Sequence, residues 1–153
     1  MYYSYMNKRT VSNASTPHLD GCEVMFSLIQ MGHAIEQKLE QALEQVGLSG
    51  AKFAALSHMV QAGGPLSLSE CATRMTCVRS NVTQLMDRLE AEGLVRRVED
   101  PSDRRAVRAA VTPLGLERQA AGALQIEKVQ QALSAPLEGL DRDALARALT
   151  AIR

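Results

Sequence analysis

Residues 67–93 read SLSECATRMTCVRSNVTQLMDRLEAEG, and this stretch decides the fold. Ser67 and Glu70 have the spacing of a capping box, which predicts that a helix begins here. Apolar side chains then recur at helical spacing in two short runs, separated by a link at 76–78. Gly93 ends the second run, because glycine readily adopts the left-handed conformation that closes helices. The stretch therefore predicts two short helices joined by a tight turn.

The sequence after Gly93 loses its helical periodicity. Residues 94–99 and 106–111 are short runs that include β-branched side chains, and the link at 100–103 has the residue types of a turn. We therefore predict a β-hairpin over residues 94–111. Two helices, a tight turn and then a hairpin are the parts of a winged helix-turn-helix, in which the second helix of the pair enters the major groove of DNA.

Helices are also predicted on both sides of this motif. Upstream, apolar periodicity indicates a long helix at about 20–46, and Ser49 caps a second one. Downstream, Thr112 caps a fifth helix with Pro113 at its first position, and Asp141 caps a sixth. The predicted fold is mainly α-helical with a small β-hairpin wing. It is arranged as a winged-helix lobe and a helical lobe built from the first and last helices.

The composition is that of one globular domain, with 46% hydrophobic and 22% charged residues in a chain of 153. We interpret residues 1–19 as a mobile tail and 20–153 as the domain. No apolar run approaches the roughly 18 residues that cross a bilayer, and the first 20 residues contain no apolar stretch typical of a signal peptide. We therefore expect a cytoplasmic protein that does not contact a membrane, with reduced cysteines.

The distribution of charge is more informative than the net charge, which is zero. Between Arg74 and Arg108 there are eight arginines and six acidic residues, whereas residues 20–50 contain five acidic residues and one lysine. Arginine's planar guanidinium suits phosphates and base edges. The middle third is thus the candidate surface for nucleic acid, provided that its arginines lie on one face.

The second helix of the pair carries the candidate base-reading side chains. Its apolar stripe accounts for Val82, Leu85, Met86 and Leu89, which leaves polar side chains exposed near the end that would enter the groove. Arginine pairs with guanine, and asparagine or glutamine with adenine. The candidate DNA-binding residues of this helix are Arg79, Ser80, Asn81, Thr83 and Gln84.

Several segments carry a resemblance to a known family. They are LSGAKFAALSHM (48–59), SECATRM (69–75), NVTQLMDRLEAEGLVRR (81–97), EDPSDRRAV (99–107) and VTPLG (111–115). In this order and at this spacing they resemble the MarR family of bacterial regulators, over most of the chain after about residue 20. No single segment is specific, but LEAEGLV together with DPSDRR and TPLG is.

The resemblance implies roles for residues of the wing. Asp103 and Arg105 match the family's D-x-R motif, in which the acid orients an arginine that enters the minor groove. A narrow minor groove concentrates negative potential and attracts arginine. We expect Arg104 to contact a phosphate. The sequence departs from the family at Val78, where a small polar residue usually caps the recognition helix, so either another group makes the cap or the helix begins one or two residues away.

The resemblance also implies a homodimer on a pseudo-palindromic operator, with the two recognition helices about one turn of DNA apart. The helix-turn-helix would lie at about 66–92 and the wing at about 94–111, with dimerisation helices at about 20–46 and 113–153. The apolar stripe of the first helix is equally consistent with a monomer core. The leading hypothesis is a ligand-responsive repressor of transcription, whose small-molecule effector favours a dimer geometry that no longer matches the operator.

Two alternatives to this hypothesis stay open. One is a winged helix used only as a protein-interaction module. The other is a thiol-based redox-sensing regulator of the same fold, for which Cys22 is the candidate. Peroxide-sensing members of the family carry a reactive cysteine in the first helix, but the alignment puts that position nearer Met25. Cys71 lies on an apolar stripe and is expected to pack as a small hydrophobic residue.

Enzymatic and metal-binding classes find little support in the sequence. There is no phosphate loop, no pairing of a nucleophile with a base and no carboxylate dyad, so we expect no catalytic residues and no cofactor. His18, His33 and His58 are scattered without the spacing of metal ligands, so we expect no metal site.

Overall fold

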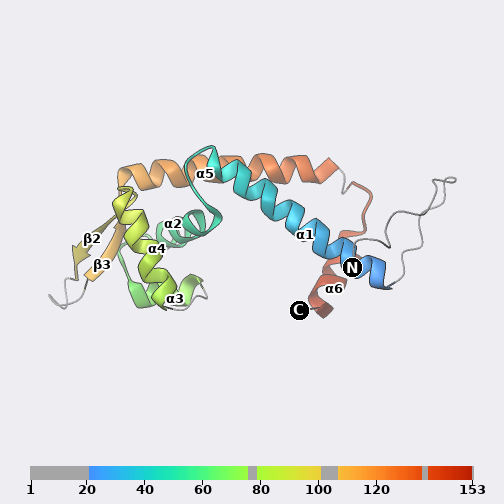
Figure 1. The fold of residues 1–153 in the computed structure, drawn as a ribbon, viewed down its shortest axis with the longest axis horizontal. Coiled ribbons are helices and arrows are strands. Elements are labelled where there is room, and N and C mark those ends of the chain that lie inside the picture. The colour runs from blue at the N-terminus through green and yellow to red at the C-terminus, as the bar shows by residue number, and fades with distance from the viewer. Residues whose placement is uncertain (1–20, 76–78, 101–106, 136–137, 153) are drawn as a thin grey trace, which may run out of the picture. The chain divides into compact units, whose positions relative to one another are not determined.

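The computed structural model describes residues 21–75, 79–100, 107–135 and 138–152. Its elements in chain order are α1 (Gly21–Glu44), α2 (Gly50–Ala62), β1 (Leu66–Ser67), α3 (Leu68–Met75), α4 (Arg79–Ala91), β2 (Val95–Glu99), β3 (Val107–Val111), α5 (Pro113–Ser134) and α6 (Arg142–Ile152) (Figure 1). The prediction of a mainly helical chain with a small β-wing is confirmed. Helix α1 crosses the boundary between two compact units, Met1–Ala34 and Ile35–Arg153, each of which is described by itself.

The strands form one antiparallel sheet in the order β1-β3-β2. Strand β3 is central, pairing Arg108 with Val98 of β2 on one side and with Ser67 of β1 on the other. The hairpin of β2 and β3 was predicted, but β1 was not. A two-residue strand is too short to give a periodic signal, and its hydrogen-bonding partner lies some forty residues away in the chain.

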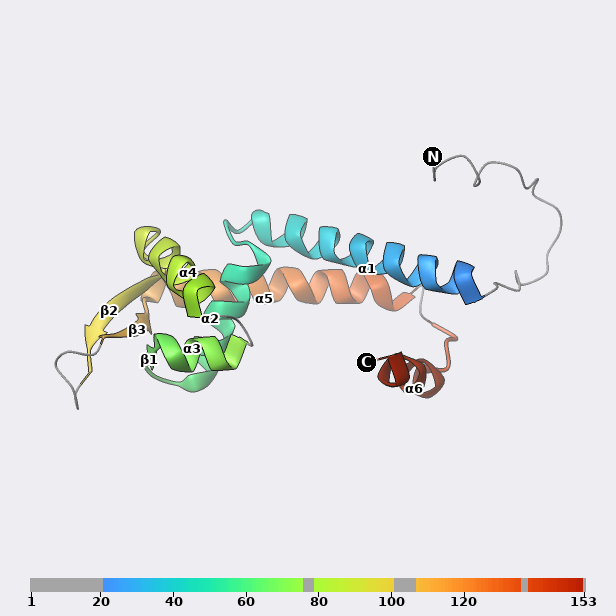
Figure 2. The ribbon, with the colours of Figure 1, turned by 60° about the horizontal axis from the view of Figure 1, so that its bottom comes forward.

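The core of the second unit lies where α2, α3 and α4 pack together beside the sheet (Figure 2). Its largest fully buried side chains are Leu43, Leu56, Cys71, Val82 and Leu89. Burial of this apolar surface is the main force that holds the short helices in place, since helices of 8 to 13 residues are marginal in isolation. Cys71 lies in this core, as predicted.

Local capping fixes where most helices begin and end. In the capping box of α3, the amide of Glu70 donates to the Ser67 hydroxyl at 3.2 Å, and the amide of Ser67 donates to the Glu70 carboxylate at 2.7 Å. Thr112 accepts from the amide of Gly115 at 3.0 Å to cap α5. Gly93 has φ +71°, the left-handed conformation that favours glycine. These predictions from local sequence are confirmed.

Two glycines let α5 approach its neighbours closely. A Cβ atom on Gly122 would lie 2.7 Å from a ring carbon of Phe53 in α2 and 3.2 Å from a methyl carbon of Leu43. A Cβ atom on Gly115 would lie 2.0 Å from the carbonyl oxygen of Leu94, just before β2. The first two turns of α5 and its middle are thereby packed against the winged-helix core.

The N-terminal part of α1 exposes large apolar side chains. Val24 and Met31 of the predicted stripe are 40% and 47% exposed, and Phe26 and Ile29 are each 49% exposed. Only the C-terminal end of the stripe, at Leu43, is buried. Among the residues that the structure describes, no helix has both the length and the apolar character needed to cross a bilayer.

Candidate nucleic-acid interface

Helix α4 has a polar edge opposite its buried face. Val82, Met86 and Leu89 are at most 2% exposed and point into the core. Asn81 and Gln84, three residues apart on the other side of the helix, are exposed. An exposed helix edge that carries amide side chains has the shape and the hydrogen-bonding groups to read bases in a major groove.

Only part of the predicted contact set falls among the described side chains. Thr83 is half-buried beside the exposed edge. Helix α4 begins at Arg79, as predicted, but the side chains of Arg79 and Ser80 lie outside the described residues. Val78 also lies outside them, so the group that caps α4 is not described. The same holds for residues 101–106, which include the predicted wing residues Asp103, Arg104 and Arg105.

Arg97 joins strand β2 to helix α4. Its Nη2 donates to the carboxylate of Asp87, and its Nη1 lies 3.2 Å from Oε2 of Glu90. The backbone N–H of Arg97 donates to the other oxygen of Glu90 at 3.3 Å. Two carboxylates on α4 are thus held by one residue of the wing.

Arg108 makes a second junction, between β3 and the start of α3. Its Nε donates to the carboxylate of Asp100, and its Nη1 donates to the carbonyl oxygen of Pro65 at 3.1 Å and to Glu70 at 3.3 Å. The hydrogen bond to Asp100, together with the negative charges of Asp100 and Glu70, raises the pKa of Arg108 against a smaller opposing effect of burial. Arg108 thereby ties the end of β2 and the capping box of α3 to the central strand.

The same geometry lowers the pKa of the Glu70 carboxyl. The largest cause is the hydrogen bond from the Ser67 amide, followed by that from the Ser67 hydroxyl, with smaller contributions from the positive charges of Arg108 and Arg74. The carboxylate form of Glu70 is therefore favoured by the contacts that start α3.

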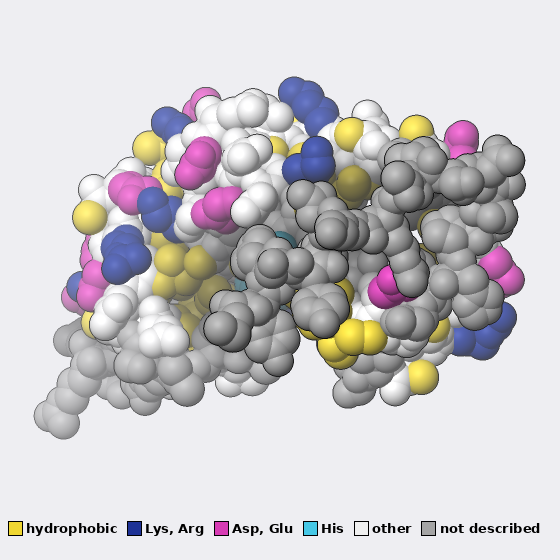
Figure 3. All heavy atoms as spheres, turned by 45° about the vertical axis from the view of Figure 1, so that its right-hand side comes forward, with side chains coloured by type: hydrophobic (Ala, Val, Ile, Leu, Met, Phe, Trp, Pro, Cys, Tyr) yellow, Lys and Arg dark blue, Asp and Glu magenta, His cyan; other side chains and the backbone are white. Residues whose placement is uncertain are grey.

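The arginines between Arg74 and Arg108 are not all available to one DNA-binding surface. Arg97 and Arg108 are engaged in ion pairs within the chain, whereas Arg74, Arg88 and Arg96 have exposed side chains. On the face that Figure 3 presents, lysine and arginine side chains are interspersed with acidic ones rather than gathered into one patch. The charge excess read from the sequence therefore overstates the positive charge free to meet DNA.

The two described cysteines differ in their surroundings. Cys22 is exposed at the start of α1, and Cys71 is buried. Burial raises the pKa of the Cys71 thiol, and the nearby charge of Glu70 adds to the effect. Cys71 is thus poorly suited to react at neutral pH, because the thiolate is the nucleophile. Within the described residues, no group of three His, Cys, Asp or Glu side chains could hold a metal ion.

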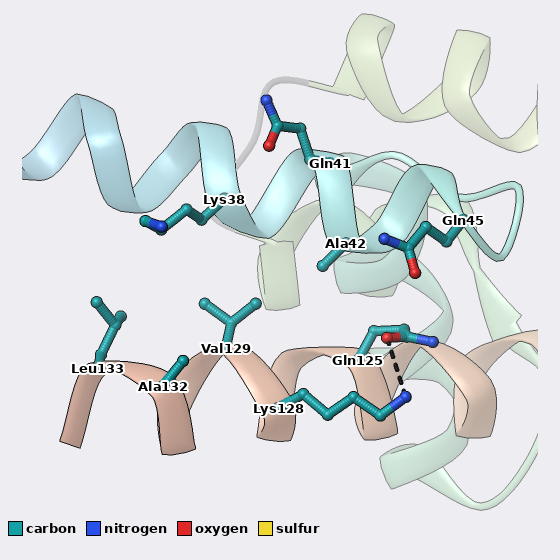
Figure 4. Close-up of a pocket in the computed structure, with 9 residues that line it drawn as sticks. All are labelled: Lys38, Gln41, Ala42, Gln45, Gln125, Lys128, Val129, Ala132 and Leu133. Carbon is teal, nitrogen blue, oxygen red and sulfur yellow. Dashed lines mark hydrogen bonds between the residues drawn. The ribbon is translucent and has the colours of Figure 1, made fainter. Parts of the chain in front are cut away.

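A hollow of about 410 Å³ lies between the C-terminal part of α1 and α5, away from α4 (Figure 4). Ala42, Val129, Ala132 and Leu133 form its apolar part, and Gln45, directly after α1, points toward α5. Its other lining residues are Lys38, Gln41, Gln125 and Lys128. The Nζ atom of Lys128 donates to the amide oxygen of Gln125 at 3.4 Å.

The sequence analysis missed the roles of Arg97 and Arg108. Arg97 contacts residues 7 and 10 positions before it, and Arg108 contacts Glu70 38 positions before it. No local pattern indicates such pairings. These contacts form because the strands of the hairpin pack beside the two helices that precede them in the chain.

Helices α2, α3 and α4 followed by the hairpin of β2 and β3 define a winged helix-turn-helix. Residues 48–107, which span these elements up to the first residue of β3, match the sequence model of the MarR family. Over this segment, the chain is similar to the MarR family.

The chain is also similar to curated HTH-type transcriptional regulators over part of their length. The chain is 34% identical over 89 residues to the uncharacterized HTH-type transcriptional regulator YsmB of Bacillus subtilis (strain 168), which covers 58% of this chain and 60% of YsmB. It is 30% identical over 93 residues to the HTH-type transcriptional repressor MdtR of the same organism, which covers 61% of this chain and 59% of MdtR. The chain thus matches less than two thirds of the length of each of these two relatives.

Solved structures extend the likeness over more of the chain. A structure of the transcriptional repressor CouR bound to a 23-mer DNA duplex has a TM-score of 0.69 and 27% identity, covering 84% of this chain and 91% of that one. CouR from Rhodococcus jostii RHA1 bound to p-coumaroyl-CoA has a TM-score of 0.65 and 25% identity, covering 84% and 88%. The arrangement of helices and wing is therefore shared beyond the segment that matches the family model.

Proposed function

We propose that this chain is a sequence-specific, DNA-binding transcriptional regulator that acts in the cytoplasm as a dimeric, ligand-responsive repressor. The observation that carries the proposal is the exposed edge of α4, where Asn81 and Gln84 lie opposite the buried side chains of Val82 and Leu89. Amide side chains at this place on a helix-turn-helix match the donor and acceptor pattern of adenine in the major groove. No catalytic role is proposed.

In the proposed complex, α4 lies in the major groove, and its N-terminal half provides the base contacts. The wing reaches the minor groove, with Arg105 inserted, Asp103 orienting it and Arg104 on a phosphate. The structure of CouR with a DNA duplex supports this mode of binding, because CouR has the same fold as this chain. The base-contacting set proposed for α4 is Arg79, Ser80, Asn81, Thr83 and Gln84.

The proposal of a homodimer is supported by apolar side chains outside the winged-helix core. Val24, Phe26 and Met31 on α1 and Leu124 on α5 are between 40% and 60% exposed. Exposed large apolar side chains are typical of protein interfaces. A second copy of the chain, placed by these helices, would set two α4 helices on one operator.

The proposal that a small molecule controls binding is supported by CouR, whose structures include one with p-coumaroyl-CoA as well as one with DNA. A ligand that binds one dimer geometry better than the other shifts the population toward it. DNA affinity falls when the favoured geometry no longer matches the spacing of the major grooves.

Selection of duplexes from a random pool by the purified full chain tests the proposal. We expect enrichment of a sequence with two related half-sites about 10 base pairs apart, bound with a steep dependence on salt. If no sequence is enriched at physiological salt, the winged helix is not used for operator recognition, and a protein-interaction module becomes the better account.

A further inference from the structure

The exposed edge of α4 has acidic neighbours on the same helix. Asp87 follows Gln84 by three residues and lies on α4 beside the edge that carries Asn81 and Gln84, whereas Glu90, three residues further on, lies on the side of the helix away from Asn81. Unpaired carboxylates at this place would repel the phosphates of a duplex docked on α4. Their charge therefore has to be compensated for tight binding.

Arg97 supplies this compensation from the neighbouring strand. Its guanidinium contacts both Asp87 and Glu90, and its backbone N–H contacts Glu90 as well. All three side chains remain partly open to solvent, at 48% for Arg97, 53% for Asp87 and 36% for Glu90. The ion pairs therefore lie on the surface of the protein and not within its core.

We propose that Arg97 is a positioning residue for DNA binding, which neutralises Asp87 beside the reading edge and Glu90 one turn further along α4, and holds α4 against the wing. The inference rests on the proposed function and adds a determinant that contacts no base. Surface ion pairs contribute little to the free energy of folding. We therefore expect Arg97 to affect the affinity for DNA more than the free energy of folding, and an experiment can distinguish the two effects.

The test measures the affinity of the full chain for its best selected duplex by fluorescence anisotropy, in four forms: wild type, Arg97→Met, Asp87→Asn/Glu90→Gln and the triple variant. We expect Arg97→Met to weaken binding by about tenfold at low salt, with a smaller loss at high salt because ions screen the carboxylate–phosphate repulsion. The triple variant should recover most of the loss.

Arg96→Met is the matched control, since Arg96 is an exposed arginine on the same strand. Arg96→Met should lower the affinity for the selected duplex. Adding Asp87→Asn/Glu90→Gln to Arg96→Met should not restore that loss. The double variant Asp87→Asn/Glu90→Gln, with Arg97 intact, should bind at least as tightly as wild type. This variant keeps the test decisive even if Arg97→Met does not fold.

Three results would overturn the inference: wild-type affinity in Arg97→Met, a loss that neither salt nor the triple variant relieves, or weaker binding by Asp87→Asn/Glu90→Gln. The second of these would mean that Arg97 touches DNA directly or acts only through structure. Failure of the wild-type chain to bind any selected duplex would instead reject the proposed function, so the two failures are distinguishable.

Discussion

Arg108 of β3 is hydrogen-bonded through its Nε to the carboxylate of Asp100, a side chain that is only 9% exposed. The pair lies at the end of β2, within the wing, and Arg108 also contacts Pro65 and Glu70. A buried carboxylate keeps its charge at low cost only while a partner compensates it. One arginine of β3 thus holds the end of β2 and the start of α3.

The first prediction concerns this pair. Arg108→Met should lower the free energy of unfolding more than a substitution of a fully exposed arginine does, because it removes the guanidinium that compensates the buried Asp100 carboxylate. Urea denaturation monitored by circular dichroism measures the change. The matched control Arg96→Met, on the exposed side of the hairpin, should change it by less than about 0.5 kcal/mol. Equal stability of the two variants would show that Arg108 does not support the wing.

The second prediction concerns the pKa of Glu70. NMR titration of its carboxyl group should give a pKa below the ordinary 4.5, and Ser67→Ala should raise it toward that value by removing the hydroxyl that donates to the carboxylate. Ser69→Ala, a neighbouring serine outside the capping box, should leave it unchanged. A pKa at or above 4.5 in the wild-type chain would contradict the capping geometry.

The sign of the accompanying stability change follows from this lowered pKa. A carboxyl group with a lower pKa in the folded state stabilises the fold above its unfolded pKa, near 4.5. That contribution is lost as the pH falls from 4.5 through the lowered folded value. Glu70→Gln should therefore make the unfolding free energy less sensitive to pH in this acidic range than in the wild type.

The third prediction concerns the close packing of α5. Gly122→Ala should destabilise the fold by about 1 to 2 kcal/mol, since the cost of overpacking against Phe53 and Leu43 exceeds the gain in helix propensity. Combining it with Phe53→Leu in a double-mutant cycle should relieve part of the cost, because the ring atoms nearest the new methyl group are removed. Gly122→Ala with wild-type or greater stability would mean that the two helices do not approach this closely in solution.

The fourth prediction concerns the apolar surface of α1. Val24→Asp/Met31→Asp should weaken the proposed homodimer and give a monomer in sedimentation velocity, since it places two charges on the exposed apolar stripe. Gln30→Asp, an exposed position off that stripe, should leave the dimer intact. A double variant that remains dimeric at micromolar concentration would remove this stripe from the interface.

Features that depend on neighbouring residues in the chain could be predicted from the sequence. Three examples are the capping box of Ser67 and Glu70, the Thr112 cap and the glycine that ends α4. Each involves residues within a few positions of one another, so a local sequence pattern predicts it. The same holds for Asn81 and Gln84, which helical periodicity alone placed off the apolar stripe of α4.

Features that depend on contacts between distant parts of the chain could not be predicted from the sequence. Strand β1, the junction at Arg108 and the contact of Gly122 with Phe53 each join residues dozens of positions apart, and none leaves a periodic trace. Periodicity predicted the apolar stripe of α1 but not what covers it, because a monomer core and an interface need the same side chains. The contacts of Arg97 also went unseen, since in sequence it is one of many arginines.

The central claim is that the exposed edge of α4 reads DNA sequence. The most direct measurement is the affinity of Asn81→Ala/Gln84→Ala for the best selected duplex and for a scrambled duplex, compared with Gln61→Ala, an exposed glutamine of α2. The account predicts at least a tenfold loss on the selected duplex, little change on the scrambled one and no effect of Gln61→Ala. Wild-type affinity and wild-type sequence preference in Asn81→Ala/Gln84→Ala would contradict it.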